Sequence, residues 1–369
     1  MARACVLHLS LTVALVPPVA RLSRHVVCPG AAYDYYIQCL GCTAEEACKA
    51  ERRLLPSIAE SLTRTQIDCL CGWLQSSLDL SDAELKKVVT VNPTLLGYSV
   101  EAMASTFDWL QDRLGLDATQ LKTMVVRHSR QMARSVESME SNCDWMQRRL
   151  DLDAKQLKKL VMGRPSVLGY SIDAMVLRLE WLQRRLDLDD AQLKKVFLLK
   201  PALLTYSVED NLAPTLDWLQ MRLDLDDAGL RMMVLRLPAV LSYNIEDNLA
   251  PTLDWLQSRL NLNRMELKKM IVTFPSLFGY SVEDNVEPKL DFFERDLGLS
   301  VSDVRAKIIS APSRLGQSLK KRYRPRLEVC RAAGADPAIV LNSAAYTDEE
   351  FCKRVGVPLE ALRAAQETV

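Results

Sequence analysis

The chain has 369 residues, of which 49% are hydrophobic, and its 47 basic and 47 acidic side chains give a formal net charge of zero. A chain of this length can bury a large core, but it exceeds the commonest size of one compact domain unless it is built from repeats. The neutral balance excludes an overall basic excess as evidence for nucleic-acid binding, so that case must rest on where the charges lie.

The N-terminal segment differs in composition from the rest of the chain. Its first acidic residue is Asp34, and it includes an apolar run, Cys5–Val16, that is followed by Pro17 and Pro18. This run is too short to span a membrane. It is typical of a secretory signal, whereas the acid-free, arginine-bearing composition is typical of an organelle presequence. We expect residues 1–40 to be a cleaved or disordered targeting segment for the mitochondrion or, alternatively, a plastid.

Tryptophan and proline recur along the chain at a constant spacing of 36 or 37 residues. The tryptophan register continues at Phe292, and its members are Trp73, Trp109, Trp145, Trp181, Trp218 and Trp255. The proline register has Ser129 in the one place where proline is missing, and its members are Pro56, Pro93, Pro165, Pro201, Pro238, Pro275 and Pro312. The segment "EDNLAPTLDWLQ" occurs twice in this frame, at Glu209–Gln220 and Glu246–Gln257. A fixed period of this length is the signature of a repeat protein.

One repeat, residues 207–241, shows how each unit is expected to fold. Leucines at helical spacing indicate a first helix, and Pro214 marks its start because proline is tolerated in the first turn. We therefore expect this helix at Pro214–Leu223. Asp226 is the predicted N-cap of a second helix, which Pro238 ends because the residue before proline disfavours the α conformation.

Capping boxes mark the second helix in five other repeats. The pairs are Ser81–Glu84, Asp117–Gln120, Asp153–Gln156, Asp189–Gln192 and Asn263–Glu266. Helices this short are marginal alone in water, so the units must stack to bury their apolar faces, and we interpret the tryptophans as packing residues. The sequence predicts an all-α solenoid superhelix of about seven to eight repeats over residues 50–335, followed by a C-terminal cap or tail at 336–369.

A family resemblance is carried by repeats such as "LDLDAKQLKKLVMGRPSVLGYSID" and by the closing "APSRLGQSLKKRYRPRLEVC". These segments resemble the mitochondrial transcription termination factor (mTERF) family over residues 50–335. The resemblance implies units of two α-helices and a short 3₁₀ turn, a basic groove that binds nucleic acid in mitochondria or plastids, and no catalysis.

Two series of basic residues follow the repeat. One position of the second helix is basic in seven successive repeats and is occupied by Lys86, Lys122, Lys158, Lys194, Arg231, Lys268 and Arg305. The other series lies near the end of the first helix, at Arg113, Arg149, Arg185, Arg222 and Arg259. One cation per repeat suits contact with a phosphate backbone. The alternative is a solvated face, in which an Asp four residues earlier pairs with Lys86, Lys194 and Arg231.

The densest basic cluster is "SLKKRYRPR", Ser318–Arg326, which contains no acid. Its cations are Lys320, Lys321, Arg322, Arg324 and Arg326. Pro325 stands where a first helix opens, so we expect the cluster to span a loop and a helix start and to contact phosphates. A solvated turn is the alternative.

Catalytic and metal-binding patterns are lacking in the sequence. Only three histidines occur, no Gly-rich phosphate loop is present, and Cys39, Cys42 and Cys48 have no second ligand pair nearby. We therefore expect a monomer with no enzymatic activity, cofactor, metal, small-molecule substrate or membrane contact. The hypothesis is an organellar factor that binds double-stranded DNA or structured RNA in transcription termination or regulation, RNA maturation or ribosome assembly, with transcription or ribosome-assembly proteins as further partners. The alternative is a protein-binding scaffold.

Overall fold

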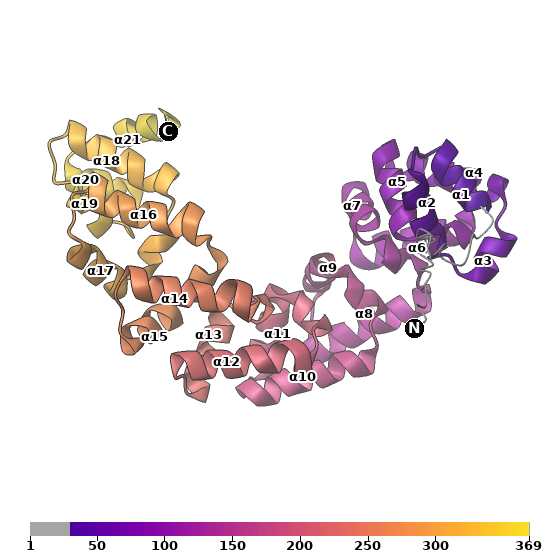
Figure 1. The fold of residues 1–369 in the computed structure, drawn as a ribbon, viewed down its shortest axis with the longest axis horizontal. Helices are drawn as coiled ribbons and strands as arrows, with labels where there is room; N and C mark the ends of the chain where they lie inside the picture. Colours follow the sequence, from indigo (N-terminus) through magenta and orange to yellow (C-terminus); the bar gives the residue numbers. More distant parts are fainter. Residues whose placement is uncertain (1–29, 369) are drawn as a thin grey trace, which may run out of the picture. The chain divides into compact units, whose positions relative to one another are not determined.

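Figure 1 shows a computed structural model of the chain, which describes residues 30–368. Within this range the regular structure is helical and contains no strand. The chain forms two compact units, one ending at Ser99 and the other running from Val100 to the C-terminus. The fold is an all-α solenoid, which confirms the predicted class.

The first unit contains one regular repeat, with three shorter helices before it. Its elements are α1 (Ala31–Gln38), α2 (Ala44–Glu51), α3 (Pro56–Ser61), α4 (Arg64–Leu78), α5 (Asp82–Val91) and the 3₁₀ turn η1 (Pro93–Gly97). Helix α1 is part of this fold, because Tyr36 is buried and its hydroxyl donates to Val89 O. The folded region therefore begins inside the segment predicted as targeting sequence, and residues 1–29 lie outside the described part.

The second unit continues the same pattern, with two helices and a 3₁₀ turn in each repeat. The first helices are α6 (Val100–Leu114), α8 (Val136–Leu150), α10 (Ile172–Leu186), α12 (Ala213–Leu223), α14 (Ala250–Arg259), α16 (Glu287–Asp291) and α18 (Arg324–Ala332). The second helices are α7 (Ala118–His128), α9 (Ala154–Gly163), α11 (Asp190–Leu199), α13 (Asp227–Arg236), α15 (Arg264–Thr273), α17 (Val301–Ser310) and the short α19 (Ala338–Asn342).

The 3₁₀ turns and the C-terminal helices complete the second unit. The turns are η2 (Ser129–Ala133), η3 (Pro165–Gly169), η4 (Pro201–Thr205), η6 (Pro238–Ser242), η8 (Pro275–Gly279) and η11 (Pro312–Gly316). Helices α20 (Asp348–Val355) and α21 (Leu359–Thr368) follow the shortened last repeat, and α21 packs on α18. Across both units, residues 64–342 thus form seven full repeats and an eighth with a truncated second helix.

The predicted helix signals agree with the structure at the second helices. All five predicted capping boxes are formed, from Ser81 in α5 to Asn263 in α15. Asp226 caps α13 by accepting from Gly229 N, although glycine has no side chain to return the bond. Successive second helices pack against one another in the order α9, α11, α13, α15 and α17.

The first helices begin earlier than predicted where they contain proline. We placed the start of the first helix at Pro214, but a π-helical turn at Val208–Leu212 precedes it and is capped by Ser207. Because Pro214 has no N–H for an i→i−4 bond, the backbone widens to the i→i−5 pattern instead of ending the helix. Helix α10, which lacks this proline, is α-helical throughout.

The core is formed mainly by leucines from both helices of each repeat. Leu216 and Leu219 of α12 and Leu253 of α14 have no exposed surface. The tryptophans of the periodic register are only half-buried, and Trp109 Nε1 donates to Glu140 Oε2 at 2.6 Å. The tryptophans therefore flank the core and do not fill it.

Candidate nucleic-acid interface

The basic series on the second helices reaches the end of the preceding repeat's first helix. Lys158 donates to Gly115 O and Lys268 to Asp224 O, both in the left-handed conformation that ends a helix. Lys86 reaches Gly41 O, Lys194 reaches Asp151 O, Arg305 reaches Leu260 O, and Arg231 pairs with the Asp187 carboxylate. A cation at a helix C-terminus is stabilising because it lies at the negative end of the helix dipole. These six residues therefore join consecutive repeats.

The contact of Lys86 with Gly41 also indicates the structural role of α1 and α2. Gly41 follows α1 with a φ of 58°, and α2 begins with a capping box formed by Thr43 and Glu46. Lys86 Nζ lies 3.0 Å from Glu46 Oε2. The two short helices thus take the place of a repeat before α4, and they cap the solenoid.

The arginine series on the first helices pairs with the next repeat. Arg222 Nη2 lies 2.8 Å from Asp254 Oδ1 and 3.0 Å from Gln257 Oε1. Arg185 makes the same contacts with Asp217 and Gln220. The acceptors are the Asp and Gln of "DWLQ", so the duplicated segment is explained in part by a joint that recurs between repeats.

The local pairs considered as the alternative for the basic series are not formed. Asp190 instead accepts from Arg149 and Gln183, and Asp227 accepts from Gln220. Six of the seven cations on the second helices, and all five arginines on the first helices, are held by contacts between repeats. Spacing within one helix does not reveal these contacts.

We expect Lys194→Met to destabilise the protein and to leave nucleic-acid affinity nearly unchanged. The substitution keeps an unbranched side chain that is one heavy atom shorter but removes the cation at the end of α8, at a cost of about 1 kcal/mol in the free energy of unfolding. Urea denaturation and an affinity titration of the same variant measure the two effects. A large loss of affinity with normal stability would instead assign this series to phosphate contact.

The cluster at Ser318–Arg326 reverses the charge found at the same position of the three preceding repeats. Ser318 caps a π turn at Leu319–Tyr323 that continues into α18. The first turn of the equivalent helices carries the pairs Glu209–Asp210, Glu246–Asp247 and Glu283–Asp284, whereas here it carries Lys320 and Lys321. Acids stabilise a helix N-terminus and cations destabilise it. The reversal therefore opposes helix stability.

The five cations of the cluster differ in exposure. Lys320, Lys321 and Arg324 are exposed. Arg322 is half-buried and donates to Tyr346 O, and burial together with the nearby Arg326 lowers its pKa.

The expectation that Arg326 contacts phosphate has to be corrected. Arg326 has no exposed surface, its guanidinium donates to Ser343 O and Tyr346 O, and it pairs with Asp348 at 2.7 Å. It occupies a position that is polar in each repeat from Thr106 onward. At this position in the third repeat, the amide of Asn142 likewise donates to Leu168 O of the following turn. This register could have been found by aligning the repeats, but residue type alone did not reveal it.

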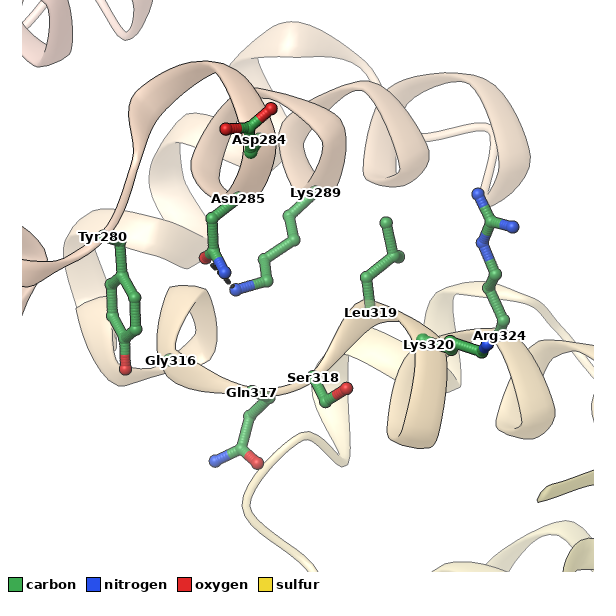
Figure 2. Close-up of a pocket in the computed structure, with 10 residues that line it drawn as sticks. All are labelled: Tyr280, Asp284, Asn285, Lys289, Gly316, Gln317, Ser318, Leu319, Lys320 and Arg324. Carbon is green, nitrogen blue, oxygen red and sulfur yellow. Dashed lines mark hydrogen bonds between the residues drawn. The ribbon is translucent and has the colours of Figure 1, made fainter. Parts of the chain in front are cut away.

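A pocket lies between the seventh and eighth repeats, beside the exposed cations. Figure 2 shows Lys320 and Arg324 on one side and Asp284 on the other. Lys289 Nζ points inward and donates to Asn285 Oδ1 and Leu315 O, both at 2.6 Å. Burial lowers the pKa of Lys289 to about 8. The pocket is lined mainly by polar and charged side chains, which come from both repeats.

The described residues contain neither a group of side chains suited to hold a metal ion nor a helix that is long and apolar enough to cross a membrane. Cys42 and Cys71 are buried free thiols, and burial raises the pKa of Cys71 to about 11.

The architecture is that of a helical-repeat protein whose surface cations stand in periodic positions. The mTERF family model matches residues 54–185 and 178–352, and the chain belongs to this family. The mTERF family generally comprises organellar proteins that bind nucleic acids through helical repeats and are not typically enzymes. A search of curated proteins finds no significant match.

Proposed function

We propose that the protein binds nucleic acid through Lys320, Lys321 and Arg324, which we call the C-terminal cluster. The charge reversal at Lys320 and Lys321 carries the proposal. Two exposed cations stand at a helix start, where they are unfavourable beside the positive end of the helix dipole. A bound polyanion would offset this cost, and the N–H groups of the first turn would add to its binding. Arg322 is next to these residues in sequence, but it is half-buried and donates to Tyr346 O.

The proposed ligand is organellar double-stranded DNA or structured RNA. Membership of the mTERF family supports this choice. The processes in which such binding would act are transcription termination or regulation, RNA maturation and ribosome assembly, with the proteins of those processes as further partners. We propose that the protein works as a monomer, without a cofactor or a small-molecule substrate.

A protein-binding scaffold is the second candidate, and exposed apolar side chains favour it. Met221 is 71% exposed and Met265 is 67% exposed. They belong to adjacent elements, since the Arg264 guanidinium donates to Met221 O at 3.1 Å. A partner with a small apolar surface would suit this patch.

Titration of a duplex DNA and of a hairpin RNA into the full chain separates the two candidates. Nucleic-acid binding predicts an association constant that falls steeply between about 50 and 200 mM salt, because counterions are released from the phosphates. The scaffold candidate predicts no measurable binding to either ligand at either salt concentration.

We further propose that the chain acts in the mitochondrion, with a plastid as the alternative. The proposal rests on the acid-free N-terminal segment and on the family, whose members are organellar. A reporter fused to residues 1–30 should enter the organelle. Secretion or cytosolic retention of the reporter would contradict the proposal.

A further inference from the structure

A second cationic surface lies at the C-terminal end of α7 and in the turn η2 between α7 and α8. No acid occurs between Asp117 and Glu137 in the sequence. Arg127, Arg130 and Arg134 are exposed, and Arg164 of the following repeat lies close enough to contribute, with Arg127, to lowering the pKa of His128, of which burial is the main cause. We call these four arginines the turn cluster.

The repeat that carries this cluster departs from the others at the same positions. Ser129 replaces the proline that opens the other 3₁₀ turns, and Arg130 stands where the third repeat has Ser166. Arg134 stands where the following repeats have Tyr170, Tyr206, Tyr243 and Tyr280. The departures thus place cations where the repeat pattern needs none.

The structure shows what the tyrosine does and what the arginine does in its place. Tyr170 donates from its hydroxyl to Thr205 O of the next turn at 3.1 Å. Arg134 lies against the next turn in the same way, since a Cβ added at Gly169 would lie 2.9 Å from Arg134 Nε. The turn η2 packs on η3. Arg134 therefore occupies the place of the tyrosine beside the next turn and adds an exposed positive charge.

The cations of this cluster have no carboxylate partner among the described residues. No ion pair joins Arg127, Arg130, Arg134 or Arg164 to an acid there, whereas the arginines of the first-helix series are paired. Buried Arg164 Nε also has no hydrogen-bond partner. Uncompensated like charges repel one another, so the cluster costs stability unless an anion binds.

We infer that the turn cluster is a second phosphate-binding site, which contacts the backbone of the same nucleic acid that the C-terminal cluster binds. The inference rests on the proposed function. The guanidinium groups would donate to phosphate oxygens, alone or in bidentate pairs, and would therefore contribute affinity without base specificity. A nucleic acid that contacts both clusters at once binds more tightly than either site alone would allow, because the second contact then forms within one complex.

The test reverts the departing positions to the residues of the next repeat. Arg130→Ser with Arg134→Tyr restores the pattern of Ser166 and Tyr170, so the fold should be kept while two charges are removed. We expect weaker binding to a duplex and a slope of log K against log salt that is shallower by about 0.9 for each phosphate that is no longer bound. The matched control, Arg148→Gln with Lys155→Gln, removes two exposed charges near the loop between α8 and α9 and should bind as the parent does.

A second measurement uses the unmodified protein and so does not depend on the variant folding. Modification of arginine by phenylglyoxal should be slowed at Arg127 and Arg130 when duplex is added, and not at Arg148. Unchanged affinity and unprotected turn arginines, in a protein that still binds duplex through the C-terminal cluster, would overturn the inference alone. Absence of duplex binding by the parent protein would overturn it together with the proposed function.

Discussion

Replacing Leu216 by aspartate is expected to unfold the fifth repeat and to loosen the repeats on either side. Leu216 is fully buried in α12. The change removes a leucine from the core and places an unpaired carboxylate there, which should cost about 4 kcal/mol or more in the free energy of unfolding. Each repeat of a solenoid is stabilised by its neighbours, so the damage should spread along the chain.

Hydrogen exchange measured along the chain shows how far this damage reaches. Protection should fall in α10 and α14 as well as in α12. Met221→Asp is the matched control, because it introduces the same charge in the same helix at a side chain that is 71% exposed. Loss of protection limited to α12, with its neighbours unchanged, would contradict the interdependence of the repeats.

Changing Lys320 to Glu and Lys321 to Asp is expected to weaken nucleic-acid binding strongly without harming the fold. The double variant carries the Glu–Asp pair that the three preceding repeats have in this turn. Acids there interact favourably with the helix dipole, so the melting temperature should stay the same or rise slightly. The association constant should fall by about 30- to 1,000-fold, because two phosphate contacts are replaced by two repulsions at about 1–2 kcal/mol per position.

The matched control for this variant is Lys155→Glu with Lys159→Asp in α9, which changes the net charge by the same amount at exposed positions. Its affinity should change little. Equal losses in both variants would mean that only the overall charge matters, and a lower melting temperature of the Lys320/Lys321 variant would mean that these lysines stabilise the helix.

Sequence periodicity predicted the repeats because each unit makes the same packing contacts and therefore needs the same residue types at the same positions. Tryptophan, proline and the capping boxes each return once per unit, and the second helices begin where the caps predicted. Because a proline normally marks the first turn, the sequence predicts too late a start for the first helix of the fifth repeat. The π turn at Val208–Leu212, which precedes α12 and accommodates Pro214, leaves no clear mark in composition. Helix α1 was missed because its short segment lies beside the acid-free N-terminus and lacks the tryptophan and proline of the register.

The candidate site was predicted less completely, because its residues differ in the contacts they make between repeats. Lys158 and Lys320 look alike in sequence, yet Lys158 donates to Gly115 O and Lys320 is exposed. Its basic side chain predicts that Arg326 belongs to the cluster. Its position in the repeat instead places it in the core, where it donates to the carbonyls of Ser343 and Tyr346. Aligning the repeats with one another would have shown both the charge reversal at Lys320 and the departures at Arg130 and Arg134.

The most direct measurement of the central claim is the salt dependence of duplex binding, compared between the parent protein and the Lys320→Gln, Lys321→Gln, Arg324→Gln variant. If these three side chains contact phosphates, the slope of log K against log salt should become shallower by about 0.9 for each contact, or nearly three in total, while circular dichroism stays unchanged. A folded variant with the same slope and the same affinity as the parent protein would contradict the assignment of the C-terminal cluster as the nucleic-acid anchor.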